Sequence, residues 1–375
     1  MSISPPATVG ILGGGQLGRM TALAARNLGF GVQVLDPSAD CAARPVADRM
    51  VVASFDDAAG AESLARECSV ITLEIEQIGG AALAAAERHA PVRPSPFVLG
   101  IVRDRARQKE WLSKLGVPIG PYAVVETPAM LASAMATLGS ELFVKACEGG
   151  YDGRSQLRTS ASTDVDDAIA SLGHRRSVAE QGLSLAFELS VLVARRPSGD
   201  MVVYPPAINH HEQQILAWSV MPGELPPTLL AQAREIALEI AGAFELEGIL
   251  AVEMFVLQDG RLLVNELAPR PHNSFHATEL ACPTSQFEQL VRAVCDLPLG
   301  ATEPIRPAAI VNLFGDLWLD GRIPSFAKAL EIEGTRLFLY GKSGARAGRK
   351  MGHIAAIGGS TDEALARAQA AFARL

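Results

Sequence analysis

The chain has 375 residues, of which 49% are hydrophobic, and a formal net charge of −8. This length predicts two or three domains with cores large enough to fold without disulfides or structural metals. The acidic charge, with no basic stripe or arm in the sequence, argues against a nucleic-acid-binding protein. Five scattered cysteines without metal-ligand spacing favour a reduced, cytoplasmic setting. No signal peptide is visible and no apolar run approaches the roughly 18 residues of a membrane span, so we expect no membrane contact.

The first hundred residues alternate predicted strands and helices. Strands are expected at Thr8–Leu12, Gly31–Leu35 and Val70–Leu73, with a glycine turn and a helix between the first two. This alternation of strands and helices is typical of a parallel sheet in a small Rossmann-like α/β domain. The proline-rich stretch Pro91–Pro96 is the expected boundary, so we assign residues 1–100 to this domain.

The middle of the chain predicts a second domain over residues 101–303. Helices are expected at Arg103–Leu115 and, with a strong amphipathic stripe, at Leu229–Phe244, and a strand at Leu142–Lys145. The segment 121–180 has its own strand and helix pattern, which predicts a lid subdomain within this domain.

Residues 304–375 predict a small C-terminal domain. It contains expected strands at Ala309–Phe314 and Arg336–Tyr340 and a closing helix that begins after Ser360. The chain is therefore predicted to be an α/β protein (α+β overall).

A predicted hairpin carries the most informative pair of residues. The segments 251–257 and 261–267 are the expected strands, and Asp259 and Gly260 are the expected turn residues, so that Glu253 falls opposite Glu266 on one face. At ~4 Å and an effective dielectric of ~20 the two charges would repel by about 4 kcal/mol. A Mg²⁺ ion completed by a nucleotide phosphate would turn this repulsion into a binding site. The alternatives are a different register or one carboxylate turned into water.

Two glycine-rich turns are candidate anion sites. Gly13–Gly18 followed by Asp36 matches a dinucleotide fingerprint, or it places the backbone N–H groups of Gln16 and Leu17 near another phosphate, or it is only a tight turn. The loop Gly149–Gln156 follows Lys145 at a strand end. Because a lysine in an apolar strand is costly without an anionic partner, this loop is the better phosphate candidate.

Three further segments are open to interpretation. If Val178–Leu183 is an edge strand, its backbone near Gln181 would face an adenine, with Glu188 on the ribose; otherwise it is a solvated acidic strand. Arg270 lies between two prolines, which favours a preorganised anion ligand over a surface turn. Lys342, Arg346, Arg349 and Lys350 suit a phosphate pocket, although a solvated charged loop is the commoner explanation.

Taken in order, six motifs resemble the N5-carboxyaminoimidazole ribonucleotide synthetases, ATP-grasp enzymes of purine biosynthesis. The motifs span nearly the whole chain and are Gly14–Met20, Thr72–Glu76, Val144–Lys145 with Gly149–Arg154, Glu180–Gly182, Asn265–Arg270 with His272–Ser274, and Thr284–Gln289. The resemblance implies an ATP-grasp fold with an N-terminal Rossmann-like preATP-grasp domain and a small C-terminal domain. It also implies that ATP phosphorylates bicarbonate to carboxyphosphate, whose carbon, or the CO₂ it releases, is captured by the amine of 5-aminoimidazole ribonucleotide, and that the enzyme is a homodimer.

The resemblance also assigns site residues. It places Mg²⁺ on Glu253 and Glu266. Around ATP it places Arg105, Lys145, Gly150, Tyr151, Asp152, Gly153, Arg154, Ser155, Gln156, Glu180, Gln181, Gly182, Leu183, Glu188, His211, Asn265 and Glu266. At the ribonucleotide and carboxyphosphate it places Gln16, Leu17, Glu74, Arg270, His272, Asn273, Lys342, Arg349 and Lys350, and it gives catalytic roles to Arg270, Tyr151, Asp152 and His272.

Three other functions remain as alternatives. One is the ATP-grasp enzyme that activates formate for glycinamide ribonucleotide, against which Tyr151–Asp152 and Asn273–Ser274 argue. Another is a nicotinamide-dependent oxidoreductase, which would leave Lys145 and the glutamate pair unexplained. The third is a noncatalytic ATP-binding protein.

Overall fold

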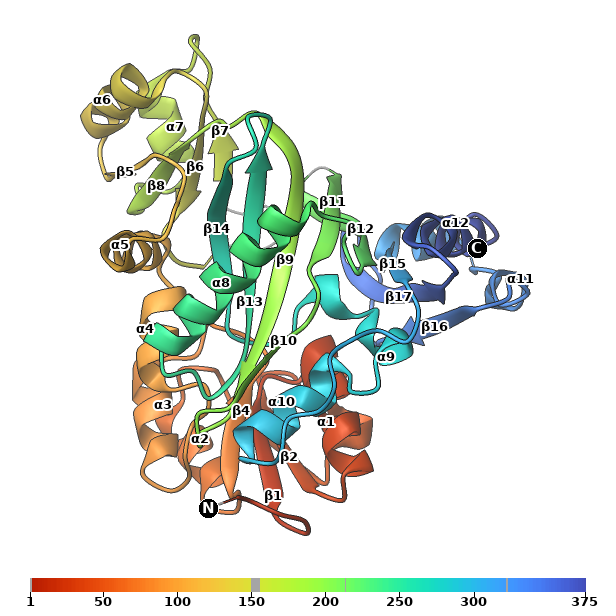
Figure 1. Cartoon of the computed structure of the whole chain (residues 1–375). Helices are drawn as coiled ribbons and strands as arrows, with labels where there is room; N and C mark the ends of the chain where they lie inside the picture. Colours follow the sequence, from red (N-terminus) through yellow and green to blue (C-terminus); the bar gives the residue numbers. More distant parts are fainter. Residues whose placement is uncertain (1, 150–155, 213, 322) are drawn as a thin grey trace.

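The computed structural model describes residues 2–149, 156–212, 214–321 and 323–375. The N-terminal part is a parallel sheet in the order β3-β2-β1-β4 with helices packed against it, at the bottom of Figure 1. Its elements are β1 (Thr8–Leu12), α1 (Gln16–Asn27), β2 (Gly31–Asp36), β3 (Arg49–Val52), α2 (Ala58–Ala65), β4 (Val70–Leu73), α3 (Gly80–Glu87) and α4 (Pro96–Val102). The expected βαβ rhythm is confirmed, because β1 pairs in parallel with both β2 and β4.

Helix α5 (Arg105–Leu115) leads into the lid. It begins two residues later than expected because Asp104 is extended and its side chain caps the N–H groups of Ala106 and Arg107. The helix ends at Gly116, whose φ is +82°.

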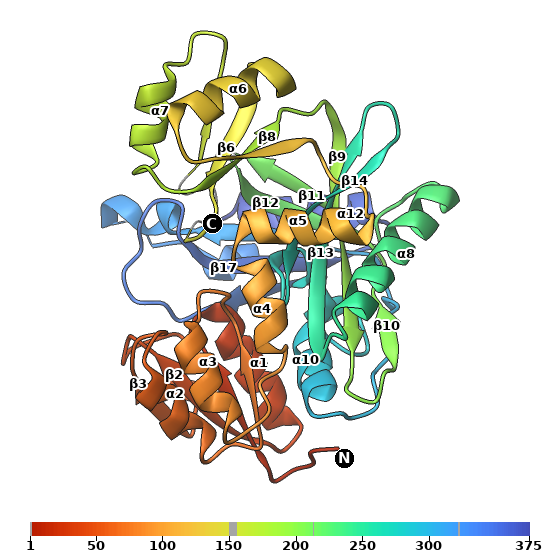
Figure 2. The ribbon, with the colours of Figure 1, turned by 90° about the vertical axis from the view of Figure 1, so that its left-hand side faces the viewer.

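The lid is a small sheet with two helices on it, at the top of Figures 1 and 2. Its strand order is β5-β8-β6-β7. Its elements are β5 (Tyr122–Val125), α6 (Pro128–Leu138), β6 (Leu142–Ala146), β7 (Gln156–Arg158), α7 (Val165–Ser171) and β8 (Ser177–Gln181). The expectation of an edge strand at 178–183 was wrong, because β8 pairs with β5 on one side and β6 on the other.

The largest sheet runs through the rest of the described residues and contains nine strands. The order is β14-β13-β9-β11-β12-β15-β17-β16, with β10 paired to β9. The central elements are β9 (Leu185–Arg195), β10 (Met201–Val203), β11 (Ala207–Glu212), β12 (Ile215–Met221), α8 (Pro227–Ala243), β13 (Gly248–Leu257), β14 (Leu262–Ala268), α9 (Thr278–Ala281) and α10 (Gln286–Val294). The C-terminal elements are β15 (Ala308–Phe314), α11 (Phe326–Ala329), β16 (Thr335–Leu339), β17 (Lys350–Ile357) and α12 (Thr361–Phe372). The C-terminal strands thus extend the central sheet, since β12 pairs with β15.

The two faces of β13 have different neighbours. Leu250 and Val252 pack in the core cluster under α8, whereas Ile249 and Ala251 pack in the cluster that contains α1 and α10. Because side chains alternate along a strand, Glu253 lies on the second face, toward the N-terminal part. No helix of the described residues is long and apolar enough to cross a membrane. The domain boundaries given above stay predictions.

Candidate active site

Glu253 and Glu266 are directly paired across β13 and β14, as predicted. The expected two-residue turn was wrong: Leu257 N–H bonds the carbonyl of Arg261 at 2.9 Å, and Gly260, with φ +85°, closes a three-residue loop. A bulge beside Glu253 leaves Asn265 without a partner on β13 and restores the pairing. Because a bulge turns neighbouring side chains to one side, Asn265 and Glu266 both line the same pocket.

The two glutamates differ in their partners and in their pKa values. Burial acts to raise the pKa of Glu253, but His272, His211 and Arg270 together hold it at about 2. The His272 Nε2 atom lies 3.0 Å from its carboxylate. Burial and the neighbouring Glu253 raise the pKa of Glu266, against an Arg105 guanidinium 3.8 Å away. Among the described residues no group of three or more His, Cys, Asp or Glu side chains is arranged to hold a metal.

A small basic pocket adjoins this pair. Glu180 lies between two lysines, with Lys145 Nζ 2.8 Å from one carboxylate oxygen and Lys109 Nζ 3.1 Å from the other. Burial acts to raise the pKa of Glu180, but the two ammonium groups hold it at about 2. The pocket is partly open to solvent, with about 200 Å³ of empty space, and is lined by Arg105, Gln108, Lys109, Lys145, Glu180, Asn265 and Glu266.

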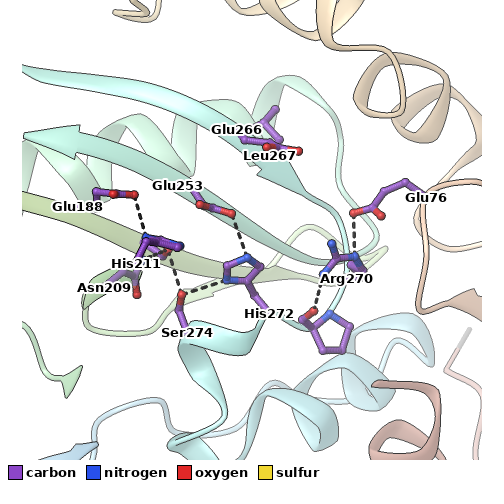
Figure 3. Close-up of polar contacts among 12 residues, drawn as sticks. Glu76, Glu188, Asn209, His211, Glu253, Glu266, Leu267, Arg270, His272 and Ser274 are labelled. Atoms are coloured by element: carbon purple, nitrogen blue, oxygen red, sulfur yellow. Dashed lines mark hydrogen bonds and ion pairs between the residues drawn. The ribbon is translucent and has the colours of Figure 1, made fainter. Parts of the chain in front are cut away.

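A chain of polar contacts holds His272, and Figure 3 follows it. Asn209 Nδ2 donates to Ser190 Oγ at 2.7 Å, Ser190 Oγ lies 3.4 Å from Ser274 Oγ, and the His272 Nδ1 atom is 3.1 Å from Ser274 Oγ. The buried amide of Gln286 accepts from His272 N–H and donates to its carbonyl. Both the ring and the backbone of His272 are therefore fixed, which orients its Nε2 atom toward Glu253.

His211 and Glu188 form a second polar pair on β11 and β9. Their Nδ1 and carboxylate atoms are 3.1 Å apart (Figure 3). Burial acts to lower the pKa of His211, but Glu188 and Glu253 raise it above its usual value, while Lys350 opposes them. These influences show that His211, Glu253 and the first residue of β17 share one electrostatic environment.

Arg270 connects the hairpin to the N-terminal part. Its Nε atom lies 2.7 Å from the Glu76 carboxylate, and one terminal nitrogen donates to the Pro271 carbonyl at 3.1 Å (Figure 3). Burial acts to lower the pKa of Arg270, but Glu76, Glu266 and Glu253 raise it. The guanidinium is therefore held, fully charged, beside the glutamate pair.

The glycine turn before α1 is filled by the chain itself. Glu74 accepts hydrogen bonds from the N–H groups of Gly15 and Gly18, and Asp36 accepts from Gly14 N–H at 2.8 Å. A Cβ atom on Gly15 would lie 2.5 Å from the Glu74 carboxylate. The glycine N–H groups thus bind the carboxylates of Glu74 and Asp36, and a dinucleotide phosphate would have to displace Glu74. Gln16 and Leu17 are the first two residues of α1, next to this carboxylate.

The cations in and beside the tail loop, which joins β16 to β17, differ in their surroundings. Lys342 donates to the Lys350 carbonyl at 3.0 Å. Burial raises the pKa of Glu74, and Lys342 is one of the groups that act against this rise. Lys350 is buried, 6% exposed, whereas Arg349 bonds carbonyls of its own loop, at Ser343 and Gly344. The Oδ1 atom of Asn273 is buried without a partner in the described part of the chain. A buried amide oxygen of this kind is a candidate ligand contact.

Sequence profiles of three domain families match consecutive parts of the chain. The ribonucleotide synthetase preATP-grasp domain matches residues 6–103, the ATP-grasp domain residues 110–287, and the phosphoribosylaminoimidazole carboxylase C-terminal domain residues 308–367. The N5-carboxyaminoimidazole ribonucleotide synthase of Bacillus subtilis (strain 168) is 40% identical over 353 residues, which are 94% of this chain and 92% of the relative. That of Brucella melitensis is 39% identical over 358 residues, 95% of this chain and 98% of the relative.

The chain belongs to the N5-carboxyaminoimidazole ribonucleotide synthase family.

Solved structures of the family have the same fold. The ADP complex of an N5-carboxyaminoimidazole ribonucleotide synthetase matches with a TM-score of 0.92 at 38% identity, over 99% of this chain and 97% of that one. The Aspergillus clavatus N5-carboxyaminoimidazole synthase, in complex with ADP and 5-aminoimidazole ribonucleotide, matches with a TM-score of 0.88 at 31% identity, over 98% of each chain. The predicted ATP-grasp fold, with its preATP-grasp and C-terminal domains, is confirmed.

The remaining site residues predicted for this synthase fall into two groups. Gly150, Tyr151, Asp152, Gly153, Arg154 and Ser155 lie outside the described residues. Gln156 begins β7, and its side chain contacts Gln214 in the turn between β11 and β12. Gly182 N–H already donates to the Glu141 carbonyl at 2.9 Å, and Leu183 follows it at the end of the lid. All of these assignments stay predictions.

Sequence reasoning missed Lys109, Gln286 and Ser190. Lys109 had a local signal, because it lies four residues after Arg105 and so on the same face of α5. Gln286 lies in a motif of the resemblance without an assigned role. Ser190 on β9 gave no signal at all.

Proposed function

We propose that this chain catalyses the ATP-dependent carboxylation of 5-aminoimidazole ribonucleotide with bicarbonate, giving N5-carboxyaminoimidazole ribonucleotide, ADP and phosphate. The observation that supports it best is the arrangement of charge. A basic pocket at Lys145 adjoins the Glu253 and Glu266 pair, and Arg270 is held beside that pair. Phosphoryl transfer relies on positioning and on charge stabilisation of this kind.

The adenine nucleotide would bind at the basic pocket. Lys145 and Arg105 would contact phosphate oxygens, and the backbone near Gln181 to Leu183 would face the base. Glu188 would accept from the ribose, oriented by its contact with His211. The pocket would widen on binding, through movement of the lid relative to the central sheet.

Glu253 and Glu266 would hold Mg²⁺. Two carboxylates paired across adjacent strands suit this ion, which takes few protein ligands and completes its shell with phosphate oxygens and water. The raised pKa of Glu266 fits the assignment, because the pair carries an excess of negative charge that a cation would neutralise. The bound ion would neutralise negative charge on the β- and γ-phosphates.

Bicarbonate would be activated beside Arg270. Its oxygen would attack the γ-phosphorus, the bond to ADP would break, and carboxyphosphate would form next to a guanidinium fixed by Glu76. The exocyclic amine of the ribonucleotide would then bond to the carboxyphosphate carbon as the carbon–oxygen bond to phosphate breaks. His272, held by Ser274 and Gln286, would orient the acceptor together with Tyr151 and Asp152.

The ribonucleotide would occupy the space between α1 and the tail loop. Its phosphate would meet Lys342, Arg349 and Lys350, and the backbone of Gln16 and Leu17. Asn273 would use its unpartnered Oδ1 atom as an acceptor. We further infer that the enzyme acts in the cytoplasm as a homodimer, which measurements of solution mass would test.

Substrate replacement tests this proposal. ADP release should require bicarbonate and should rise strongly with 5-aminoimidazole ribonucleotide. In parallel wells, formate should not replace bicarbonate, and glycinamide ribonucleotide should not replace the acceptor. Turnover that depends on formate and the glycinamide acceptor would show the related formate-activating enzyme instead, and no turnover with any pair would favour a noncatalytic ATP-binding protein.

A further inference from the structure

Lys109 is the least exposed charged residue of the basic pocket. Its side chain is 5% exposed, against 17% for Lys145, and it lies on α5, outside the lid strands that carry Lys145 and Glu180. Its only ion-pair partner among the described residues is Glu180, and Tyr122 lies under its ammonium at 5.8 Å. Burial of a lysine ammonium with one carboxylate partner costs free energy of desolvation, so this position suggests a functional role.

Each carboxylate oxygen of Glu180 lies next to one lysine ammonium group. If Lys145 turns to a nucleotide phosphate, it gives up its 2.8 Å contact with Glu180. Without a second cation, this movement would leave a buried carboxylate uncompensated, which is strongly unfavourable. Lys109 contacts the other carboxylate oxygen, so Glu180 still has a positively charged partner while Lys145 contacts the phosphate. The carboxylate is therefore never buried without a cation.

We propose that Lys109 is a positioning residue that acts through Glu180: it is the permanent counter-ion that frees Lys145 for the phosphates of the adenine nucleotide. The inference rests on the proposed function, and it adds a role for a residue that need not touch the nucleotide. Without Lys109, Glu180 would hold Lys145 more tightly. The phosphate contact would then be lost although Lys145 is still present.

Calorimetric titration of ADP and adenosine into the full-length protein tests this role. Lys109→Met should weaken ADP binding on the order of 30-fold, as for removal of one member of a buried charge pair, and should leave adenosine binding unchanged. Lys114→Met is the matched control, because Lys114 pairs with Glu110 at 2.7 Å on the same helix but is 73% exposed. That control should bind ADP like the unmodified protein.

A double-mutant cycle separates positioning from direct contact. Lys145→Met should weaken ADP binding strongly in the unmodified protein but only about twofold in the Lys109→Met background, where Lys145 is already withheld. In a Glu180→Gln background, which has no buried carboxylate to compensate, Lys109→Met should have little effect on ADP binding. This second comparison still tests the inference if the Lys109→Met single variant does not fold.

Three results would overturn the inference. Full additivity of the two lysine changes would show that Lys109 does not act through Lys145. A loss of ADP binding from Lys109→Met in the Glu180→Gln background would show a direct phosphate contact. An equal loss of adenosine binding would show that Lys109 shapes the base site. No binding of ADP by the unmodified protein would instead overturn the proposed function itself.

Discussion

The carboxylate of Glu74 lies inside the glycine turn that begins α1, where it accepts a hydrogen bond from Gly18 N–H at 2.6 Å. The positive end of the helix is thus neutralised by the chain's own side chain. Burial raises the pKa of Glu74, and the two backbone donors and Lys342 counteract that rise. The glycine turn is therefore built to admit a carboxylate, which explains why a dinucleotide-like sequence occurs in an ATP-grasp protein.

Gly18→Ala should destabilise the protein by on the order of 1–3 kcal/mol, because the new methyl group would lie 2.3 Å from the Gly13 carbonyl oxygen. Gly100→Ala is the control. Gly100 lies within α4 with nothing in 4 Å of an added Cβ, so alanine there should add about 0.5–1 kcal/mol of stability. Urea unfolding measures both, and a Gly18→Ala protein as stable as the Gly100→Ala protein would contradict the packing described for this turn.

Glu253→Gln and Glu266→Gln should have opposite effects on stability without added metal. At neutral pH the environment favours ionised Glu253 and disfavours ionised Glu266. Glu253→Gln should therefore cost on the order of 2 kcal/mol, whereas Glu266→Gln should leave the stability unchanged or raise it.

Both variants should lose magnesium-supported turnover, because each removes one of the two proposed ligands. Thermal unfolding with and without MgCl₂, together with ADP release, measures these effects. Wild-type turnover by Glu266→Gln would remove that residue from the metal site.

Acid should destabilise the protein through His353. This buried ring stacks on His276 at 4.7 Å, and its Nδ1 atom contacts the Tyr340 hydroxyl at 2.8 Å. Burial, aided by Arg336, lowers the pKa of His353 from 6.5 to about 3. Below pH 6.5 the His353 imidazole binds a proton in the unfolded chain but stays neutral in the folded chain. The free energy of unfolding therefore falls as the pH drops toward 3. At pH 5 the loss from this one group is about 2 kcal/mol.

His353→Gln should flatten the fall in stability between pH 6.5 and pH 5 by about that amount, and the exposed His210→Gln should not. Urea unfolding across this pH range gives the comparison. Equal slopes for the two variants would show that His353 does not carry the effect.

Arg349→Ala and Lys350→Ala should distinguish the ribonucleotide site from the ATP site. We expect the KM for the ribonucleotide to rise strongly and that for ATP to stay nearly constant, because neither cation lines the basic pocket. Arg349→Ala is the cleaner test, since Lys350 is buried and begins β17. A change confined to the ATP KM would move Arg349 to the nucleotide site.

Local sequence patterns predicted the elements that depend on local rules. The hairpin, the amphipathic face of α8 and the cap of α12 at Ser360 are such cases, since each follows from a period or a capping residue. The Glu253 and Glu266 pairing was predicted correctly although the loop was one residue longer, because the bulge at Asn265 compensates.

Features that depend on distant partners were not predictable in this way. The interior position of β8 follows from its pairing with β5, which its own residues do not encode. The same holds for the extension of the central sheet by β15 and for the contact between Lys109 and Glu180, which are 71 positions apart in the sequence. Glu74 in the glycine turn is a third case, since the fingerprint alone does not say which anion it holds.

Transfer of oxygen from bicarbonate to phosphate tests the central claim most directly. With ¹⁸O-labelled bicarbonate, MgATP and 5-aminoimidazole ribonucleotide, the account predicts that each phosphate released carries one oxygen from bicarbonate. That atom forms the bridge of carboxyphosphate and stays on phosphorus when the amine takes the carbon. Mass spectrometry of the phosphate gives the answer: label in the phosphate supports the mechanism, and unlabelled phosphate released at the same rate would contradict it.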